Sequence, residues 1–111
     1  MTRLLHLTER ALWDAARRTG TYEMSTRGKT LGEVGFIHCS LPEQLPGVAA
    51  FLYGGYEGPD ELVVLGIDSE RLTAPVRFEA PRPGGVEFPH IYGPLPVDAV
   101  VEVSPWRTAP A

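Results

Sequence analysis

The pattern of apolar and polar positions along the chain predicts two helices. In 9–19, four small or apolar residues recur at the spacing of one helical face, and Gly20 follows as a stop. That face consists of Leu12, Ala15, Ala16 and Thr19. A second helix is predicted over 46–53, where a proline opens an apolar run and two glycines follow it. The segment 21–34 has no clear periodicity and contains two glycines, so a loop is predicted there.

Short apolar runs bounded by turn-forming residues predict extended strands. The most regular run is ELVVLGID, and the run EFPHIYG is interrupted by proline, which suits an edge strand or a bulge. The predicted strands cover 3–7, 35–39, 61–68, 76–80, 87–93 and 99–103. Because strands and helices do not alternate regularly, the pattern predicts a compact α+β domain over 1–104. Residues 105–111 are then a C-terminal tail, with Trp106 packed back onto the core.

Composition narrows the class of protein further. The chain has 111 residues, enough for one domain, and its net charge of −4 disfavours non-specific binding of nucleic acid. Its one cysteine forms no internal disulfide, and no cysteine cluster indicates structural zinc. No apolar stretch approaches the roughly 20 residues that cross a bilayer, so we expect a cytoplasmic protein without membrane contacts. Arginines in the first third of the chain form either a local phosphate-binding surface or a solvated helix face and loop.

The three histidines of the chain have similar surroundings. Each lies in a predicted strand, and each is followed two positions later by a residue with a hydroxyl group. The pairs are His6 with Thr8, His38 with Ser40, and His90 with Tyr92. Residues two apart on a strand share a face, so each pair presents an imidazole beside a hydroxyl. Such pairs orient a polar ligand while aromatic neighbours cover an apolar ring, and the recurrence predicts a cleft shared by all three histidines.

Other readings of these residues stay open. A single histidine on a strand often belongs to the core, with its N–H bonded to a carbonyl, and Thr8 and Ser40 are also placed to cap helices. Three converging imidazoles are also a possible metal site, although the usual short ligand spacings are absent. Cys39 directly follows His38, but adjacent strand residues face opposite sides, which disfavours a cysteine nucleophile with that base.

Two motifs resemble a known family. GFIHCS with Gln44, together with FPHIYGPLPVDAVVEV, is similar to domain-of-unknown-function family 952, and the resemblance covers nearly the whole chain. This family is similar in fold to ADP-ribosyltransferases. The resemblance therefore implies a compact α+β domain with a split, mostly antiparallel sheet and two main helices, and a cleft for NAD.

The resemblance also implies roles for particular residues. His6, with Thr8 beside it, looks like the histidine that grips the NAD ribose, and Phe36 or His38 looks like the residue facing the nicotinamide ring. A transferase glutamate stabilises positive charge on the ribosyl ring, and Glu79 and Glu87 both fit that place. Apart from the resemblance, the residues themselves predict further ligand contacts: Arg17, Arg18 or Arg27 neutralises phosphate, and Ser40, His90 and Tyr92 line the pocket.

Two functions from different classes follow from these observations. The first is an enzyme that binds NAD or a related nucleotide as substrate and cleaves its nicotinamide glycosidic bond or transfers ADP-ribose. The second is a non-catalytic module that binds a nucleotide or another small ligand, since no glutamate lies in a specific motif and no glycine-rich phosphate loop is present. A metal-dependent hydrolase and a purely structural or interaction protein are further alternatives.

Overall fold

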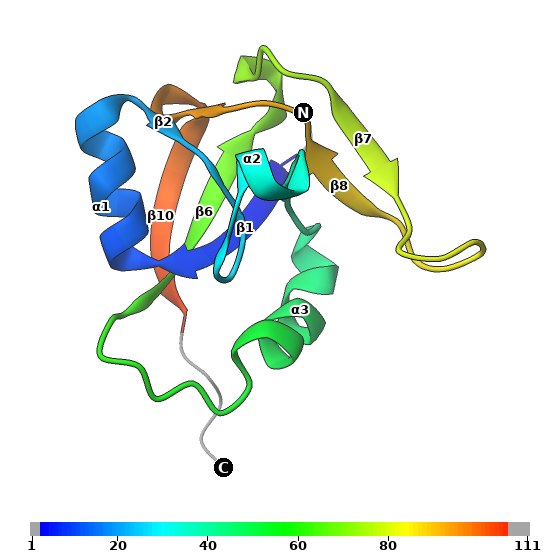
Figure 1. Cartoon of the computed structure of the whole chain (residues 1–111), viewed down its shortest axis with the longest axis horizontal. Helices are drawn as coiled ribbons and strands as arrows, with labels where there is room; N and C mark the ends of the chain where they lie inside the picture. The colour runs from blue at the N-terminus through cyan, green and yellow to red at the C-terminus, as the bar shows by residue number, and fades with distance from the viewer. Residues whose placement is uncertain (1–2, 107–111) are drawn as a thin grey trace.

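Two three-stranded antiparallel sheets form the framework of the molecule (Figure 1). The structure is a computed structural model that describes residues 3–106. The first sheet has the strand order β1-β6-β10 and the second has the order β5-β8-β7, while β2-β9 and β3-β4 form short pairs. The strands are β1 (Arg3–Glu9), β2 (Thr21–Tyr22), β3 (Met24–Thr26), β4 (Lys29–Thr30), β5 (Ile37–His38), β6 (Leu62–Asp68), β7 (Val76–Glu79), β8 (Phe88–Ile91), β9 (Leu95–Pro96) and β10 (Val100–Trp106).

The helices fall where the apolar pattern predicts them. The longer ones are α1 (Arg10–Thr19) and α3 (Leu45–Tyr53), and a single turn, α2 (Leu31–Val34), lies between them. Within residues 3–106 there are also three 3-10 turns: η1 (Pro42–Gln44), η2 (Ser69–Arg71) and η3 (Val97–Ala99). Gly20 ends α1 with φ 98°, a conformation that glycine adopts without strain. The described residues therefore form the α+β arrangement with two main helices that the sequence predicts.

Strand β6 is the centre of the first sheet. Leu62 through Ile67 are all buried, with β1 paired on one side and β10 on the other. Alternate residues of β6 enter two separate hydrophobic cores, because side chains alternate across a strand. The first core, on the α1 side, contains Leu4, Trp13, Ala16, Tyr22, Ile37, Cys39, Val63, Leu65, Ile67, Ile91, Leu95 and Ala99. The second core, on the α3 side, contains Leu7, Leu45, Ala49, Tyr53, Leu62 and Val64.

The predicted buried face of α1 is rotated in the structure. Trp13 and Ala16 are buried, whereas Ala15 and Thr19 are exposed. The large indole of Trp13 buries more apolar area than either of those side chains, so its position decides which face meets the sheet.

The predicted loop over 21–34 is wrong. Strands β2, β3 and β4 and the turn α2 occupy this segment. Strand β2 has only two residues and is paired with β9, which is distant in the sequence, so no local periodicity indicates it. The start of α2 did carry a signal: the Thr30 hydroxyl accepts from the Glu33 amide, and the Glu33 carboxylate accepts from the Thr30 amide.

The predicted helix caps at Thr8 and Ser40 are also wrong. Helix α1 begins after Glu9, and the Ala11 amide donates to the Asp60 carboxylate instead. At η1 the side chain of Gln44 accepts a hydrogen bond from the amide of Leu41. The residue that precedes this turn is therefore Leu41 and not Ser40. Both hydroxyl residues lie in extended segments that pair with other strands, so they are not at a helix start.

The proline of β8 predicts an edge strand or a bulge, but β8 lies in the centre of its sheet and pairs with β5 and β7 without a register shift. The Cys39 amide donates to the Pro89 carbonyl where the pairing of β8 with β5 ends. The missing N–H of Pro89 therefore removes little of the hydrogen bonding between these two strands. Strand β10 continues to Trp106 because its last residues pair with β6, so the predicted tail boundary at 105 is too early. Trp106 does pack against the second core, and the predicted tail residues 107–111 lie outside the described residues.

Candidate functional site

The second sheet has one buried face and one face on which most side chains are half-buried. Ile37, Cys39 and Ile91 point into the first core. Their neighbours in sequence point the other way, because side chains alternate along a strand. We call the set of residues on that side the outer face: Phe36, His38, Arg77, Glu79, Phe88, His90 and Tyr92. Five of the predicted site residues therefore lie together on one surface.

Glu79 connects two of the predicted ligand-binding residues. The Nδ1 atom of His90 lies 2.8 Å from Glu79 Oε1, and the Tyr92 hydroxyl donates to the same oxygen. A carboxylate oxygen that accepts two hydrogen bonds is held in position on the strand. The side chain of Glu79 is 37% exposed and that of His90 is 10% exposed.

Aromatic rings pack around these groups. Phe36 stacks on the imidazole of His90 with centroids 4.0 Å apart and planes 14° apart. The ring of His38 lies 5.3 Å from both Phe88 and His90. Arg77 extends its guanidinium over the Tyr92 ring, 5.1 Å from the centroid. The outer face thus combines flat rings with one cation and one anion.

The charges of these groups at neutral pH follow from their contacts. Hydrogen bonds from Tyr92 and His90 hold the pKa of Glu79 below its ordinary value, so the carboxylate is ionised. The bond to Glu79 raises the pKa of Tyr92, which keeps the phenol protonated as a donor. Burial, together with the neighbouring His90, lowers the pKa of His38 to about 4, so its imidazole is neutral.

His6 lies in the first core and not on the outer face. It is 3% exposed, and its Nδ1 lies 2.7 Å from the backbone carbonyl of His38. Its Nε2 lies 2.8 Å from the Tyr22 hydroxyl, which lies 2.8 Å from Thr8 Oγ1. The predicted His6 and Thr8 pair therefore exists, with Tyr22 inserted between the two side chains, but it is closed to solvent.

The hydrogen bonds of His6 determine its tautomer. The His38 carbonyl only accepts, so Nδ1 carries the proton and Nε2 accepts from Tyr22. The hydroxyl of Thr8 then supplies the proton of its bond to Tyr22. Burial lowers the pKa of His6 to about 4, against the opposing effect of the His38 carbonyl. His6 is therefore a neutral core histidine that supports the backbone of an outer-face residue.

Ser40 and Arg27, both predicted to bind ligand, hold structural positions. Ser40 is buried and exchanges two backbone hydrogen bonds with Leu5, which join β1 to the end of β5. Arg27 donates to the Leu52 carbonyl at 2.6 Å, and its guanidinium lies over the rings of Tyr53 and Tyr56. These contacts bind the β3-β4 turn to the end of α3, away from the outer face.

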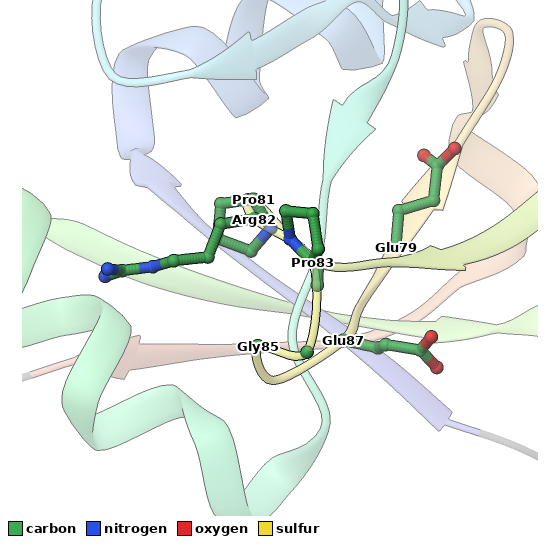
Figure 2. A pocket seen from close by; sticks show the side chains of 8 residues that line it. Glu79, Pro81, Arg82, Pro83, Gly85 and Glu87 are labelled. Atoms are coloured by element: carbon green, nitrogen blue, oxygen red, sulfur yellow. The ribbon is translucent and has the colours of Figure 1, made fainter.

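Glu87 lies apart from the outer-face rings, on the open hollow of the β7-β8 hairpin. The hollow has a volume of about 540 Å³ and is lined by residues from Glu79 to Glu87. Figure 2 shows Glu79 and Glu87 pointing apart, with Arg82 extended away from both. Among the described residues, Glu79 makes contacts with the imidazole and the phenol, and Glu87 contributes only its backbone carbonyl, to Gln44. The two candidate glutamates therefore line the same hollow but differ in their contacts.

The remaining alternatives have less support in the described part of the chain. Burial raises the pKa of the Cys39 thiol, so it is a protonated core residue and a poor nucleophile. Among residues 3–106, no group of three or more His, Cys, Asp or Glu side chains is arranged to hold a metal ion. None of the helices in the same residues is long and apolar enough to cross a membrane.

Four residues of the site region received no role in the sequence analysis. Arg77 and Phe88 could have been found, because their strands form a hairpin that places them on the face of Glu79 and His90. Gln44 belongs to a recognised motif, but its amide donates to the Glu87 carbonyl at 2.8 Å, a contact across 43 positions. Tyr22 lies in a two-residue strand, and no sequence pattern around it indicates a place near the site.

The fold and the outer face define a small α+β protein with imidazole, aromatic and carboxylate groups gathered on one sheet. The sequence profile of the family described as "Protein of unknown function (DUF952)" matches residues 7–103. The chain belongs to this family.

Solved structures of a relative have the same fold. A crystal structure of protein CC0527 from Caulobacter crescentus is 36% identical, with 94% of this chain and 85% of that chain covered and a TM-score of 0.75. Its solution NMR structure is 36% identical, covers 94% and 84% of the two chains, and has a TM-score of 0.70. No curated protein matches the chain.

Proposed function

We propose that the protein binds NAD or a related nucleotide on the outer face and cleaves the nicotinamide glycosidic bond, by hydrolysis or by transfer of ADP-ribose. The observation that supports this most is the position of Glu79, an ionised carboxylate fixed beside stacked rings by His90 and Tyr92. When nicotinamide leaves, positive charge develops on the ribosyl ring, and a preorganised carboxylate stabilises that charge. Glu79 has this role, and Glu87 does not.

The other outer-face residues supply the binding chemistry. Phe36, His38 and Phe88 offer ring surfaces for a flat heteroaromatic ring, and the neutral His38 imidazole offers one donor and one acceptor for an amide. Arg77 is exposed on the same face and is a partner for phosphate oxygens. His6 and Thr8 do not touch the ligand in this proposal, because Tyr22 already occupies their polar atoms.

The test measures binding and reaction separately. The rise in melting temperature with added NAD reports binding, since a ligand specific for the native state stabilises it. Released nicotinamide, measured by chromatography, reports cleavage. We expect Glu79→Gln to keep the thermal shift and to lose release, and His38→Ala to lose the shift. Glu43→Gln, which changes an exposed carboxylate of η1, is the matched control and is expected to retain both. Absence of a thermal shift with NAD would overturn the proposal, as would release that Glu79→Gln leaves unchanged.

A non-catalytic binding module is the second candidate, and the exposure of Glu79 favours it. Cleavage of a glycosidic bond benefits from a site that excludes water, whereas this side chain is 37% exposed. In that case NAD or another nucleotide raises the melting temperature and no nicotinamide appears. The same pair of measurements therefore separates the two functions.

A further inference from the structure

The imidazole of His90 is oriented by two direct contacts and by one residue that acts through Glu79. Glu79 Oε1 lies 2.8 Å from Nδ1, the Tyr92 hydroxyl holds the same oxygen, and Phe36 stacks flat on the ring. Because an ionised carboxylate only accepts hydrogen bonds, Nδ1 carries the proton in this contact. When the ring is neutral, the lone pair is then on Nε2. A carboxylate that fixes the tautomer and plane of a histidine in this way is the arrangement that prepares an imidazole for proton transfer.

The Nε2 atom of His90 remains accessible. No residue in 3–106 makes a hydrogen bond to it. The buried side-chain nitrogen and oxygen atoms without a partner in this part of the chain are Ser25 Oγ and Trp106 Nε1. Since Nε2 of His90 is not among them, it retains some contact with solvent, although the residue as a whole is only 8% exposed. His6 offers the opposite case, because both of its ring nitrogens are bonded and it is 3% exposed.

The reaction proposed above leaves one step without a residue. When a hydroxyl or a water molecule attacks the ribosyl carbon, its proton has to be accepted. Glu79 is a weak base, because two hydrogen bonds stabilise its ionised form. His38 is also a weak base, since burial disfavours its protonated form, and no described side chain orients its ring. His90 has both an orienting carboxylate and an open nitrogen.

We propose that His90 is the general base of the site, with Nε2 as the proton acceptor and with Glu79 and Tyr92 positioning its ring. This assignment rests on the proposed function for its substrate. The attacking oxygen forms a bond to C1 of the nicotinamide ribose, and its proton passes to Nε2. The C1–N bond breaks with its electron pair going to the ring nitrogen, so nicotinamide leaves as a neutral molecule. The imidazolium remains beside the Glu79 carboxylate and then gives its proton to water.

The charged and titratable groups that face His90 are few. Glu79 and Arg77 face it from β7, His38 from β5, and Tyr92 from the position directly after β8. The pH profile of turnover therefore reports this whole group and not His90 alone.

The first experiment tests the imidazole without any substrate. Diethyl pyrocarbonate modifies accessible unprotonated ring nitrogens, and peptide mapping by mass spectrometry identifies them. We expect His90 to be modified and His6 to be protected as an internal control, and Glu79→Gln to slow modification of His90 several-fold. Nitrogen-15 spectra of the histidine rings are expected to show the Nδ1–H tautomer for His90. A His90 that resists the reagent as His6 does, or that shows the other tautomer, would overturn the assignment.

The second experiment uses His90→Asn, whose side-chain amide retains a donor to Glu79 and removes the base. We expect the thermal shift with NAD to be retained while nicotinamide release falls about 100-fold. Equal turnover in His90→Asn and the wild-type protein would show that His90 is not the base. If NAD neither binds nor reacts with the wild-type protein, the proposed function fails, and the reagent and the tautomer alone decide whether His90 is an oriented, open base.

Discussion

The backbone carbonyl of His38 accepts a hydrogen bond from Nδ1 of His6, across 2.7 Å. The two residues lie on different sheets, β1 of the first and β5 of the second. This bond therefore connects the core of one sheet to the strand that carries the outer face of the other. The sequence assigned these two histidines to one cleft, but they have different roles: His6 supports the backbone, and His38 places its half-buried ring on the outer face.

The burial of His6 makes stability depend on pH. Its pKa is about 4 in the folded protein, below the ordinary 6.5, so the unfolded state takes up a proton first as the pH falls. The free energy of unfolding therefore falls from about pH 6.5 downward, and the share of His6 amounts to roughly 2 kcal/mol by pH 5. Urea denaturation at pH 7 and pH 5 measures this loss. In His6→Gln the loss is expected to be smaller by that amount, and an unchanged loss would contradict the prediction.

Removing the Tyr22 hydroxyl is expected to destabilise the fold. Tyr22→Phe leaves Nε2 of His6 and the hydroxyl of Thr8 buried without their shared partner. A buried polar group without a hydrogen bond costs about 1–3 kcal/mol, and the free energy of unfolding is expected to fall by an amount in that range. Thr8→Val removes the second of these groups, so the double variant should lose less than the sum of the singles. Strict additivity would show that the three side chains do not act as one network.

Much of the fold could be predicted from local patterns. The run of β6 combines β-branched residues with clear boundaries, and α1 ends at a glycine with positive φ. Strand β2 could not be predicted, because it has two residues and exists through its pairing with β9. Pairing over such distances leaves no periodic signal in a single sequence.

The candidate site was predicted in part. Strand alternation correctly placed Phe36 with His38 and His90 with Tyr92, since period-two geometry depends only on the strand itself. The burial of His6 could not be predicted, because it depends on Tyr22 arriving from another strand. The sequence alone did not distinguish Glu79 from Glu87, because the difference depends on the register of the β7-β8 hairpin. That register sets Arg77 opposite His90 and Glu79 opposite Phe88, so Glu79 lies on the same face as His90.

The side chain of Gln44 is expected to stabilise the start of β8. Its amide nitrogen donates to the Glu87 carbonyl, and its amide oxygen accepts from the Leu41 amide. Gln44→Glu retains the acceptor but places a carboxylate oxygen against the carbonyl of Glu87. We expect the free energy of unfolding to fall by about 1–2 kcal/mol at pH 7, measured by urea denaturation. Glu43→Gln is the matched control in the same turn, and an equal loss in both variants would assign the effect to η1 and not to this contact.

Arg27 is expected to contribute to stability and not to ligand binding. Its guanidinium donates to the Leu52 carbonyl and lies 4.7 Å from the Tyr53 centroid and 5.4 Å from that of Tyr56. Arg27→Ala is expected to lower the free energy of unfolding by about 1–2 kcal/mol and to leave the thermal shift with NAD unchanged. Arg18→Ala, at an exposed position in the last turn of α1, is the control and should change stability by less than about 0.5 kcal/mol. If Arg27→Ala keeps full stability but loses the NAD shift, then Arg27 belongs to the binding site, as the sequence alone predicts.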